Sequence, residues 1–600
     1  MQWAASLRAR VRAALCAVLL SSSACSAAEL FVAPGGDDGA GDGSFARPFA
    51  TPARALAAVD ALPRPWSANA SISLRGGTYA LSAPLVLAPG GGGRDGFALA
   101  LRAYAPDAAP AILSGGLPVA QSAWERVAPG SEVWAAPCPA GTPAGARQVW
   151  ADGARVTETF LGNATSVYGY QLLSKDDSVV TETGYLTNST RFLRAAAHPL
   201  QLASDAEFLF RMVGSQWVEE RVRVTSWEML EDGKTLNITL AQPAFYMLRH
   251  KLYVGSFPSH VINLAAALEG DPLIGAGDGI AVSGSGYVSG ANEGSAGACR
   301  LLFRAAPGGG APVEAVVGAL DSLLVLEGNR SAQPAALTVN DVSIEGLVFQ
   351  HSAWLAPSGP CGYIPDQSGI FYECSDAAQM PGMGHALTGR VPGALALKTA
   401  RRVRVFNCSF AHTGANGIVV EEGSQFIEIG RSLFSDVGGS AARFGQVDDW
   451  SSTDESRFNS DCSMSDSVLL GLAVELRDCA AVMGGYFRRL TLQSNTIRNA
   501  SWAGITIGWG WGQHESPLPT HGGNLIAQND VQFVNLLTSD GGPIYVMGPQ
   551  QWSEMTGNFV GHALHHAAML YHDEGSGYWH THHNVVNEST ADQFPCGGWW

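Results

Sequence analysis

The stretch GNLIAQNDVQFVN (523–535) decides the fold, because its pattern recurs three more times along the chain. In each copy, apolar residues alternate with polar ones, and an Asn is followed two positions later by Ile or Val. The other copies are RRLTLQSNTIRNAS (488–501), WSEMTGNFVGHA (552–563) and YWHTHHNVVNES (578–589), so the repeated Asn falls at 495, 529, 558 and 584. Alternation with a period of two indicates strands, and repeats of this length indicate a solenoid.

The same pattern continues toward the N-terminus, with Cys408 and Ser432 at the position of the Asn. Each turn of a solenoid buries its inward side chains only by stacking on its neighbours. Amides stacked at a bend can hydrogen-bond along such an array of parallel strands. We therefore predict an all-β chain that folds as a right-handed parallel β-helix.

The solenoid is expected to be built in parts. Residues 29–119 predict an N-terminal cap, with an amphipathic helix around Pro52–Leu62, followed by the first turns. Between residues 120 and 330 the repeat is lost and ordinary antiparallel strands are expected, which predicts an inserted β-rich domain. Residues 331–600 hold the main repeats. The chain stops soon after its last acidic motif, so it could also be a fragment that lacks a C-terminal cap.

Residues 1–28 have the features of a signal peptide. Arg8, Arg10 and Arg12 precede the apolar run AALCAVLL (13–20) and a set of small residues. This run is too short to span a bilayer, so we expect a secreted protein with no membrane span. Glycosylation sequons agree with export and begin at Asn69, Asn163, Asn188, Asn237, Asn329, Asn407, Asn499 and Asn587.

The composition excludes some partners. The net charge of −17 argues against nucleic acid, whose phosphates require Lys and Arg. It also disfavours a highly anionic substrate. The protein is expected to be monomeric.

Cysteines bracket two insertions in the second half of the chain. Cys361 and Cys374 flank one, and Cys462 and Cys479 flank the other. In an exported protein, disulfides are the expected state of such pairs. A zinc site is the alternative, but the sequence has no C-x-x-C pair to support it.

Several motifs resemble those of known secreted proteins. They are LFVAPGGDDGAGDGSFARPFATPARAL (30–56), LRGGTYALSAPLVL (74–87), ILSGG (112–116), RQVWADGARV (147–156), IEGLVFQHSAW (344–354), SDGGPIYVMG (539–548) and LYHDEGSGYW (570–579). The first three resemble the opening of the pectate-lyase-like right-handed β-helices. The others resemble the group that contains glycoside hydrolase family 141. The resemblance implies a polysaccharide-cleaving enzyme of fucosidase or xylanase type.

The repeat places the acidic motifs on one wall. Counting back from the repeated Asn aligns IYVM (544–547) with LYHD (570–573), so Tyr545 should stack on Tyr571, with Asp573 on the same outward face. Glycoside hydrolysis needs two carboxyl groups. Our candidates are Asp540 and Asp573, with Glu574 in reserve. Possible substrate-binding residues are Tyr545, Tyr571, Trp511, His521, His351 and Trp354.

Each candidate also has a plain structural explanation. Asp540 precedes two glycines, so its carboxylate could simply cap a turn. The alignment also allows Asp540 and Asp573 to lie more than about 10 Å apart. His residues crowd the last two turns, but alternation should split them between faces. We therefore expect no metal or other cofactor, with calcium as the alternative.

Three functions remain open. The first is a secreted glycoside hydrolase that acts on a cell-wall or extracellular polysaccharide. The second is a polysaccharide lyase or epimerase on the same fold, which needs a base beside a uronate. The third is a non-catalytic glycan-binding or adhesive protein, because fold alone does not fix function.

Overall fold

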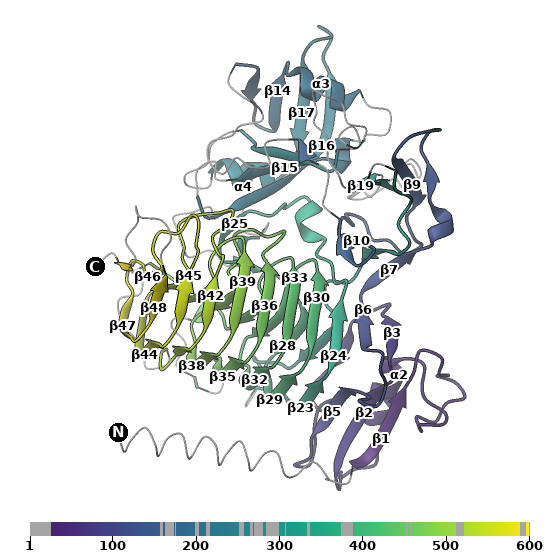
Figure 1. Cartoon of the computed structure of the whole chain (residues 1–600), viewed down its shortest axis with the longest axis vertical. Coiled ribbons are helices and arrows are strands. Elements are labelled where there is room, and N and C mark those ends of the chain that lie inside the picture. Colours follow the sequence, from purple (N-terminus) through teal and green to yellow (C-terminus); the bar gives the residue numbers. More distant parts are fainter. Residues whose placement is uncertain are drawn as a thin grey trace.

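A computed structural model of the chain shows a long coil with a second lobe beside it (Figure 1). The structure describes residues 26–156, 160–161, 173, 176–197, 203–211, 216–250, 257–264, 268, 280–283, 299–306, 308–332, 336–373, 388–449, 454–455, 458–511, 521–587 and 596–598. The coil appears in Figure 1 as ladders of stacked arrows running from teal to yellow.

Three parallel sheets form the walls of the coil. Sheet A contains, in spatial order, β1 (Ser26–Val32), β2 (Asn69–Leu74), β5 (Leu99–Ala103), β23 (Val339–Glu345), β29 (Ala400–Phe406), β32 (Gln425–Gly430), β35 (Ser460–Ser465), β38 (Arg488–Gln493), β41 (Leu525–Ala527), β44 (Pro549–Thr556) and β47 (Gly577–His582). Sheet B contains β3 (Gly77–Ala80), β6 (Ala111–Ser114), β24 (Leu347–Gln350), β30 (Ser409–Thr413), β33 (Leu433–Val437), β36 (Val468–Leu472), β39 (Thr496–Ala500), β42 (Asp530–Gln532), β45 (Phe559–Gly561) and β48 (Val585–Asn587). Sheet C contains β4 (Leu85–Leu87), β22 (Leu324–Glu327), β28 (Gly393–Lys398), β31 (Asn416–Glu421), β34 (Ala442–Phe444), β37 (Val482–Gly484), β40 (Ile505–Ile507), β43 (Ile544–Val546), β46 (Leu570–His572) and β49 (Cys596–Gly598).

Each turn of the coil takes one strand from each sheet in the order A, B, C, as β29, β30 and β31 do. All neighbours within these three sheets are parallel. The prediction of an all-β, right-handed parallel β-helix is therefore confirmed. Its first turn is covered by helix α2 (Pro52–Asp60), which buries Ala55, Leu56 and Val59. The Thr51 side chain caps this helix by accepting a hydrogen bond from the Arg54 backbone N–H at 3.2 Å.

The core fills the inside of the coil with apolar side chains stacked in files. Phe349, Phe410 and Phe434 are fully buried on successive strands of sheet B. Their rings are stacked with nearly parallel planes, and the centroids of successive rings are 4.7 and 5.0 Å apart. Such files form because parallel strands in register place equivalent residues directly over one another. Packing within the coil therefore fixes how neighbouring turns align.

A buried ladder of asparagines runs along the bend between sheets A and B. The Nδ2 of Asn495 donates to Oδ1 of Asn529 at 3.0 Å, and Asn529 donates likewise to Asn558 at 3.0 Å. The ladder continues from Asn558 to Asn584 at 2.9 Å. Ser432 occupies the equivalent position in an earlier turn, where its hydroxyl accepts from the Cys408 backbone N–H. The repeated Asn thus provides register at an otherwise apolar bend.

Antiparallel sheets come between the early and the later turns along the chain, although those turns pair directly with one another in the coil. They contain β7 (Gly116–Val119), β8 (Glu125–Arg126), β9 (Val133–Pro137), β10 (Val149–Ala151), β11 (Ala154–Arg155), β12 (Phe160–Leu161), β13 (Ser178–Val180), β14 (Gly184–Thr187), β15 (Glu207–Arg211), β16 (Glu219–Met229), β17 (Leu236–Leu240), β18 (His260–Ile262), β19 (Ile280–Ser283), β20 (Arg300–Arg304) and β21 (Ala315–Gly318). Helices α3 (Thr190–Ala196) and α4 (Ala244–His250) and the 3-10 turns Gln121–Ala123 and Ala203–Asp205 lie among them. The coil resumes at β22, slightly before the boundary expected at residue 330. A third 3-10 turn, Ala356–Ser358, precedes a small sheet of β25 (Pro365–Gln367), β26 (Ile370–Tyr372) and β27 (Thr388–Arg390).

Partly buried ion pairs hold the inserted strands against the coil. Arg155 pairs with Asp436, the two atoms being 2.7 Å apart, and also with Glu475. Trp150 donates from its indole N–H to Asp436 at 3.2 Å. Arg221, on β16, donates to the backbone carbonyl of Glu475 at 3.0 Å. Because these groups are removed from water, their mutual contacts fix the insertion in one orientation.

The cysteines depart from one prediction. Cys462 and Cys479 are buried free thiols, so the predicted bond between them is wrong. Cys462 faces the inside of the coil on β35, whereas Cys479 lies outside it against Tyr363, so the wall separates them. Cys361 is disulfide-bonded, and Cys374 lies outside the described residues. A further disulfide joins Cys138 to Cys299 across the ends of β9 and β20, with the Cα atoms 5.4 Å apart.

The expected signal peptide lies almost wholly outside the described part of the chain, which begins at Ser26. Within the described ranges, no helix combines the length and the apolar composition needed to cross a bilayer.

The asparagine ladder is testable by replacing one of its central members. Asn529→Ala leaves the Asn495 backbone N–H and the Leu492 carbonyl without their buried partners. Each unsatisfied buried group costs about 1–3 kcal/mol, so we expect the free energy of unfolding to fall by about 2–4 kcal/mol. Urea denaturation would measure it. Gln493→Ala, which removes an outward-facing amide contact on β38, should change stability by less than about 0.5 kcal/mol; equal losses in both variants would contradict a special role for the ladder.

Candidate active site

A pair of stacked tyrosines marks the outer face of sheet C. Strands β43 and β46 pair in parallel with Tyr545 opposite Tyr571. Their ring centroids are 4.7 Å apart and their planes differ by 13°. The flanking Ile544 and Val546 belong to the interior of the coil, so alternation directs Tyr545 outward. The stacking predicted from the repeat is therefore present.

Both candidate aspartates lie at the hydroxyl of Tyr571. This O–H group is 3.0 Å from Oδ1 of Asp573 and 3.4 Å from Oδ1 of Asp540. Together these distances place the two carboxylate oxygens at most about 6.4 Å apart, an upper limit that is compatible with the separation of about 5–5.5 Å found in retaining glycosidases. Tyr545 also donates its hydroxyl to Oδ2 of Asp573. The turns thus bring together two carboxylates that the sequence alone allowed to be farther apart.

The environments of the two acids differ. Burial, and then the negative charge of Asp573, raise the pKa of Asp540 above its ordinary value. Asp573 is only 8% exposed, and its two carboxyl oxygens accept hydrogen bonds from the hydroxyls of Tyr545 and Tyr571. Burial and the nearby carboxylates raise the pKa values of Tyr545 and Tyr571 well above the ordinary range. The site therefore combines Asp540, whose pKa is raised, with Asp573, which accepts hydrogen bonds from two neutral hydroxyl groups.

Local backbone geometry sets the position of Asp540. It has a positive φ of 55° at the end of the segment that leads into β43. Gly542, two residues after Asp540, lies close to the next turn of the coil: an added Cβ would be 2.0 Å from the Ala568 carbonyl oxygen. Only glycine fits there, so the SDGG motif allows the chain to press against the turn that carries Tyr571. Asp540 is thereby directed at the Tyr571 hydroxyl.

Aromatic side chains wall the site. Trp511 donates its indole N–H to the Tyr545 hydroxyl at 3.1 Å and packs against Trp509, with ring centroids 4.9 Å apart. Trp502 meets Tyr545 edge-on, at 5.8 Å between centroids. His521 is buried against Tyr486, whose hydroxyl donates to the Trp509 carbonyl. Trp511 thus contacts Tyr545 of the site directly. His521 is connected to the same wall indirectly, through Tyr486 and Trp509.

The insertion reaches this wall from a distant part of the sequence. The Ser539 hydroxyl donates to the side-chain oxygen of Gln216 at 3.0 Å, and its backbone N–H donates to the Gln216 carbonyl at 2.9 Å. The neighbouring Trp217 packs against the same aromatic cluster and donates to the Asp366 carbonyl at 2.8 Å. The contacts of Gln216 and Trp217 with this wall were not predicted, because nothing in the repeat pattern indicates a contact between residues 323 positions apart.

Three of the proposed residues are not in contact with the acid pair. Glu574 is exposed at the turn that follows Asp573. His351 instead lies between Ser114, Trp150 and His412 on the side of sheet B. Trp354 is buried against Tyr363. His351 thus packs beneath Trp150 of the inserted strands, and Trp354 packs against Tyr363 and Phe371, so the structure places neither side chain beside the acids as predicted.

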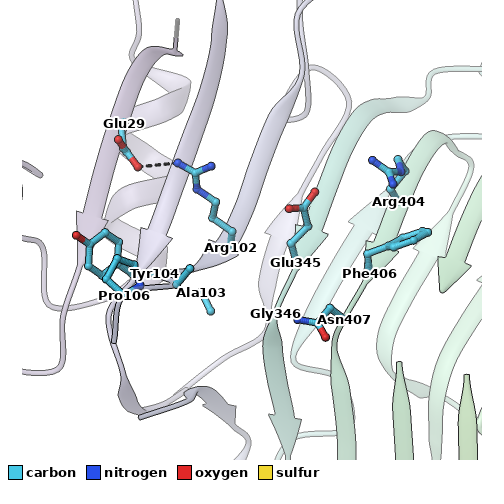
Figure 2. Close-up of a pocket in the computed structure, with 11 residues that line it drawn as sticks. Glu29, Arg102, Ala103, Tyr104, Pro106, Glu345, Gly346, Arg404, Phe406 and Asn407 are labelled. Atoms are coloured by element: carbon cyan, nitrogen blue, oxygen red, sulfur yellow. Dashed lines mark hydrogen bonds and ion pairs between the residues drawn. The ribbon is translucent and has the colours of Figure 1, made fainter. Parts of the chain in front are cut away.

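A separate groove lies on the outer face of sheet A at the N-terminal end of the coil (Figure 2). It has a volume of about 830 Å³ and is lined by Glu29, Arg102, Tyr104, Glu345, Arg404 and Phe406, among others. Figure 2 shows Glu29 and Arg102 directed at each other, and their ion pair measures 2.7 Å. Arg404 pairs with Glu428 at 3.2 Å. Of the two acids that line the groove, Glu29 is thus paired with an arginine, and Glu345 accepts a hydrogen bond from the Ser343 hydroxyl.

Comparisons with known proteins identify the fold. No protein-family model matches the chain, and a search of curated proteins finds no match. Among solved structures, one described as a glycoside hydrolase covers 95% of this chain and 95% of its own, at 20% identity and a TM-score of 0.74. A structure of XylC with xylose covers 90% and 69%, at 11% identity and a TM-score of 0.45. A mannuronan C-5 epimerase module, AlgE6 of Azotobacter vinelandii, covers 46% and 73%, at 11% identity and a TM-score of 0.27.

The first of these structures establishes a shared architecture along nearly the whole chain. The parallel β-helix expected from the sequence is therefore confirmed as the fold. Because one such fold supports several unrelated activities, the function must be argued from the site.

Replacing Asp540 tests the electrostatics of the site. A carboxyl whose pKa is higher in the folded than in the unfolded chain lowers stability as pH rises from its unfolded value, about 3.9, through its folded value. We therefore expect Asp540→Asn to melt at a higher temperature than wild type at pH 7, with the difference shrinking toward pH 4. Thermal unfolding at several pH values measures this. Glu574→Gln, at an exposed position, is the control; an Asp540→Asn variant that is less stable at pH 7 would contradict the assignment.

Proposed function

We propose that the protein is a glycoside hydrolase and that Asp540 and Asp573 are its catalytic carboxyl groups. The observation that carries this proposal is the sharing of the Tyr571 hydroxyl by the two aspartates, which brings them within about 6.4 Å of each other. The likeness in fold to a glycoside hydrolase supports it. Buried acids in contact are costly to a protein, so such a pair favours a functional explanation.

The environments of the two acids favour distinct roles. Asp540, whose pKa is raised by burial and by Asp573, is suited to donate a proton to the oxygen of the leaving sugar. Asp573 is suited to act as the carboxylate that attacks the sugar carbon or activates a water. Its two tyrosine donors hold the carboxylate in place and keep it from rotating toward Asp540.

The tyrosines disfavour the lyase or epimerase alternative. That chemistry would need a base, and Tyr571 is the tyrosine in contact with both acids. Burial and the two carboxylates raise its pKa far above neutrality, so it remains a protonated donor. In the proposed roles, the carboxylate of Asp573 would also repel the uronate group on which a lyase acts.

The substrate class follows from the wall. Trp511 is only partly buried and lies against the buried Tyr545 ring, so it presents aromatic surface near the acids, which is suited to the apolar face of a sugar ring. We propose a polysaccharide of a cell wall or extracellular matrix, of fucose- or xylose-containing type, as the sequence motifs imply. We further propose that the protein is secreted; the Cys138–Cys299 disulfide is compatible with an oxidising compartment.

A glycan panel tests the proposed reaction. Wild type should release reducing sugar without an unsaturated product. Asp540→Asn and Asp573→Asn should each lower kcat by at least about 10²-fold, because each removes one partner of the proton transfer or attack. The exposed Glu574→Gln should keep full activity. Full activity in either aspartate variant would refute the site, and an unsaturated uronide product would instead support the lyase.

Tyr571→Phe tests the shared hydroxyl through the pH profile. The hydrogen bond from Tyr571 lowers the pKa of Asp540, in opposition to burial. Removing it should raise that pKa, so the alkaline side of the kcat profile should move to higher pH if Asp540 must be protonated. The Trp511→Phe variant keeps an aromatic ring but loses the hydrogen bond to Tyr545, so the alkaline side of its kcat profile should move less. A shift to lower pH in Tyr571→Phe would contradict the role of Asp540.

A further inference from the structure

Three potential metal ligands lie together on the outer face of sheet A, on a different wall from the acid pair. They are Glu554 on β44 and His580 and His582 on β47. Alternation directs both histidines to the same side, because they are two residues apart on one strand. The parallel register places Glu554 opposite His580, and Thr556 opposite His582. Neighbouring Met555 points into the core, so Glu554 and Thr556 point outward.

The spacing of the three side chains suits one ion. One ligand atom from each lies within 4.8 Å of the other two. Nε2 of His582 is 2.8 Å from Oε1 of Glu554, and the rings of His580 and His582 are 4.1 Å apart between centroids. Two atoms bonded to one zinc at about 2.1 Å each lie at most about 4.2 Å apart. A small rotation of the exposed His580 ring is enough to close the set.

The hydrogen bonds of His582 prepare it as a ligand. Its Nδ1 is 3.2 Å from the Thr556 hydroxyl and also contacts the His583 ring. A metal-binding histidine typically donates its other N–H to an oxygen, which fixes the ring and the tautomer. A proton on Nδ1 leaves the Nε2 lone pair facing the Glu554 carboxylate. Two electron-rich atoms at 2.8 Å repel each other unless a proton or a cation lies with them.

The donor set selects the kind of metal. Two imidazoles and one carboxylate match the ligands of Zn²⁺ and similar divalent transition metals. Calcium prefers six to eight oxygen ligands, so it does not suit this cluster. Three protein ligands also leave one position for water in a four-coordinate site.

We propose that Glu554, His580 and His582 bind one Zn²⁺ ion that joins two neighbouring turns of the coil. The ion links β44 to β47 from outside, where the asparagine ladder links the same turns from within. All three ligands point away from the interior, so the site does not depend on any coil that follows β47. The sequence did not predict a metal, because alternation was expected to split the histidine cluster; it does so, but it leaves His580 and His582 on one side.

Zinc titration of the full chain, produced without a histidine tag and stripped with a chelator, tests this site. Calorimetry with ZnCl₂ should give one equivalent bound per chain, and zinc should raise the melting temperature. His582→Ala, His580→Ala and Glu554→Gln should each weaken zinc binding by about tenfold or more, and Thr556→Val should weaken it by about tenfold through loss of the oriented ring. The Glu554→Gln change is nearly isosteric and keeps the proposal testable if a histidine variant misfolds.

His562→Asn is the matched control and should bind zinc like wild type, because His562 follows β45 of sheet B in the turn that carries Glu554 and stacks on Phe533. Calcium chloride in place of zinc should give no equivalent shift in melting temperature. The proposal is overturned if wild type binds no zinc, or if the three ligand variants bind zinc as tightly as the control. Because the readouts are binding and melting temperature, the outcome is independent of the proposed hydrolase activity.

Discussion

The parallel register between successive turns is the constraint on which the whole structure depends. It places each residue beside its counterpart in the next turn, so a one-residue slip would turn every side chain to the opposite face. Two devices hold it: the files of stacked apolar rings inside sheet B, and the amide ladder from Asn495 to Asn584. The stacking of Tyr545 on Tyr571 follows from this register, and so does the approach of both aspartates to one hydroxyl.

The three walls of the coil have different environments. The outer face of sheet C is covered by aromatic side chains and reached by the insertion, so Asp540 is partly withdrawn from water and its pKa rises. The outer face of sheet A carries ion pairs such as Glu29 with Arg102 in the groove of Figure 2, and the group of possible metal ligands at Glu554, His580 and His582. The same repeat therefore supports distinct chemistry, depending on which wall is covered.

The sequence predicted what repeats, and it failed where the structure depends on single long-range contacts. The Asn pattern revealed the coil, and the alignment of IYVM with LYHD revealed the tyrosine pair, because both follow from local periodicity. Cysteine positions along the chain could not show that the coil wall stands between Cys462 and Cys479. The repeat pattern also could not show that Gln216 contacts Ser539, because this contact depends on how the insertion packs against the coil. The position of His351 was not predictable either, because it depends on its contact with Trp150 of the insertion.

The central claim is that the register brings the carboxylates of Asp540 and Asp573 close enough to influence each other. The most direct measurement is a carbon-13 NMR titration of the Asp540 carboxyl in protein labelled at aspartate, in wild type and in Asp573→Asn. Our account predicts a raised Asp540 pKa in wild type that falls when the charge of Asp573 is removed. An Asp540 pKa that is ordinary in wild type, or unchanged by the substitution, would contradict it.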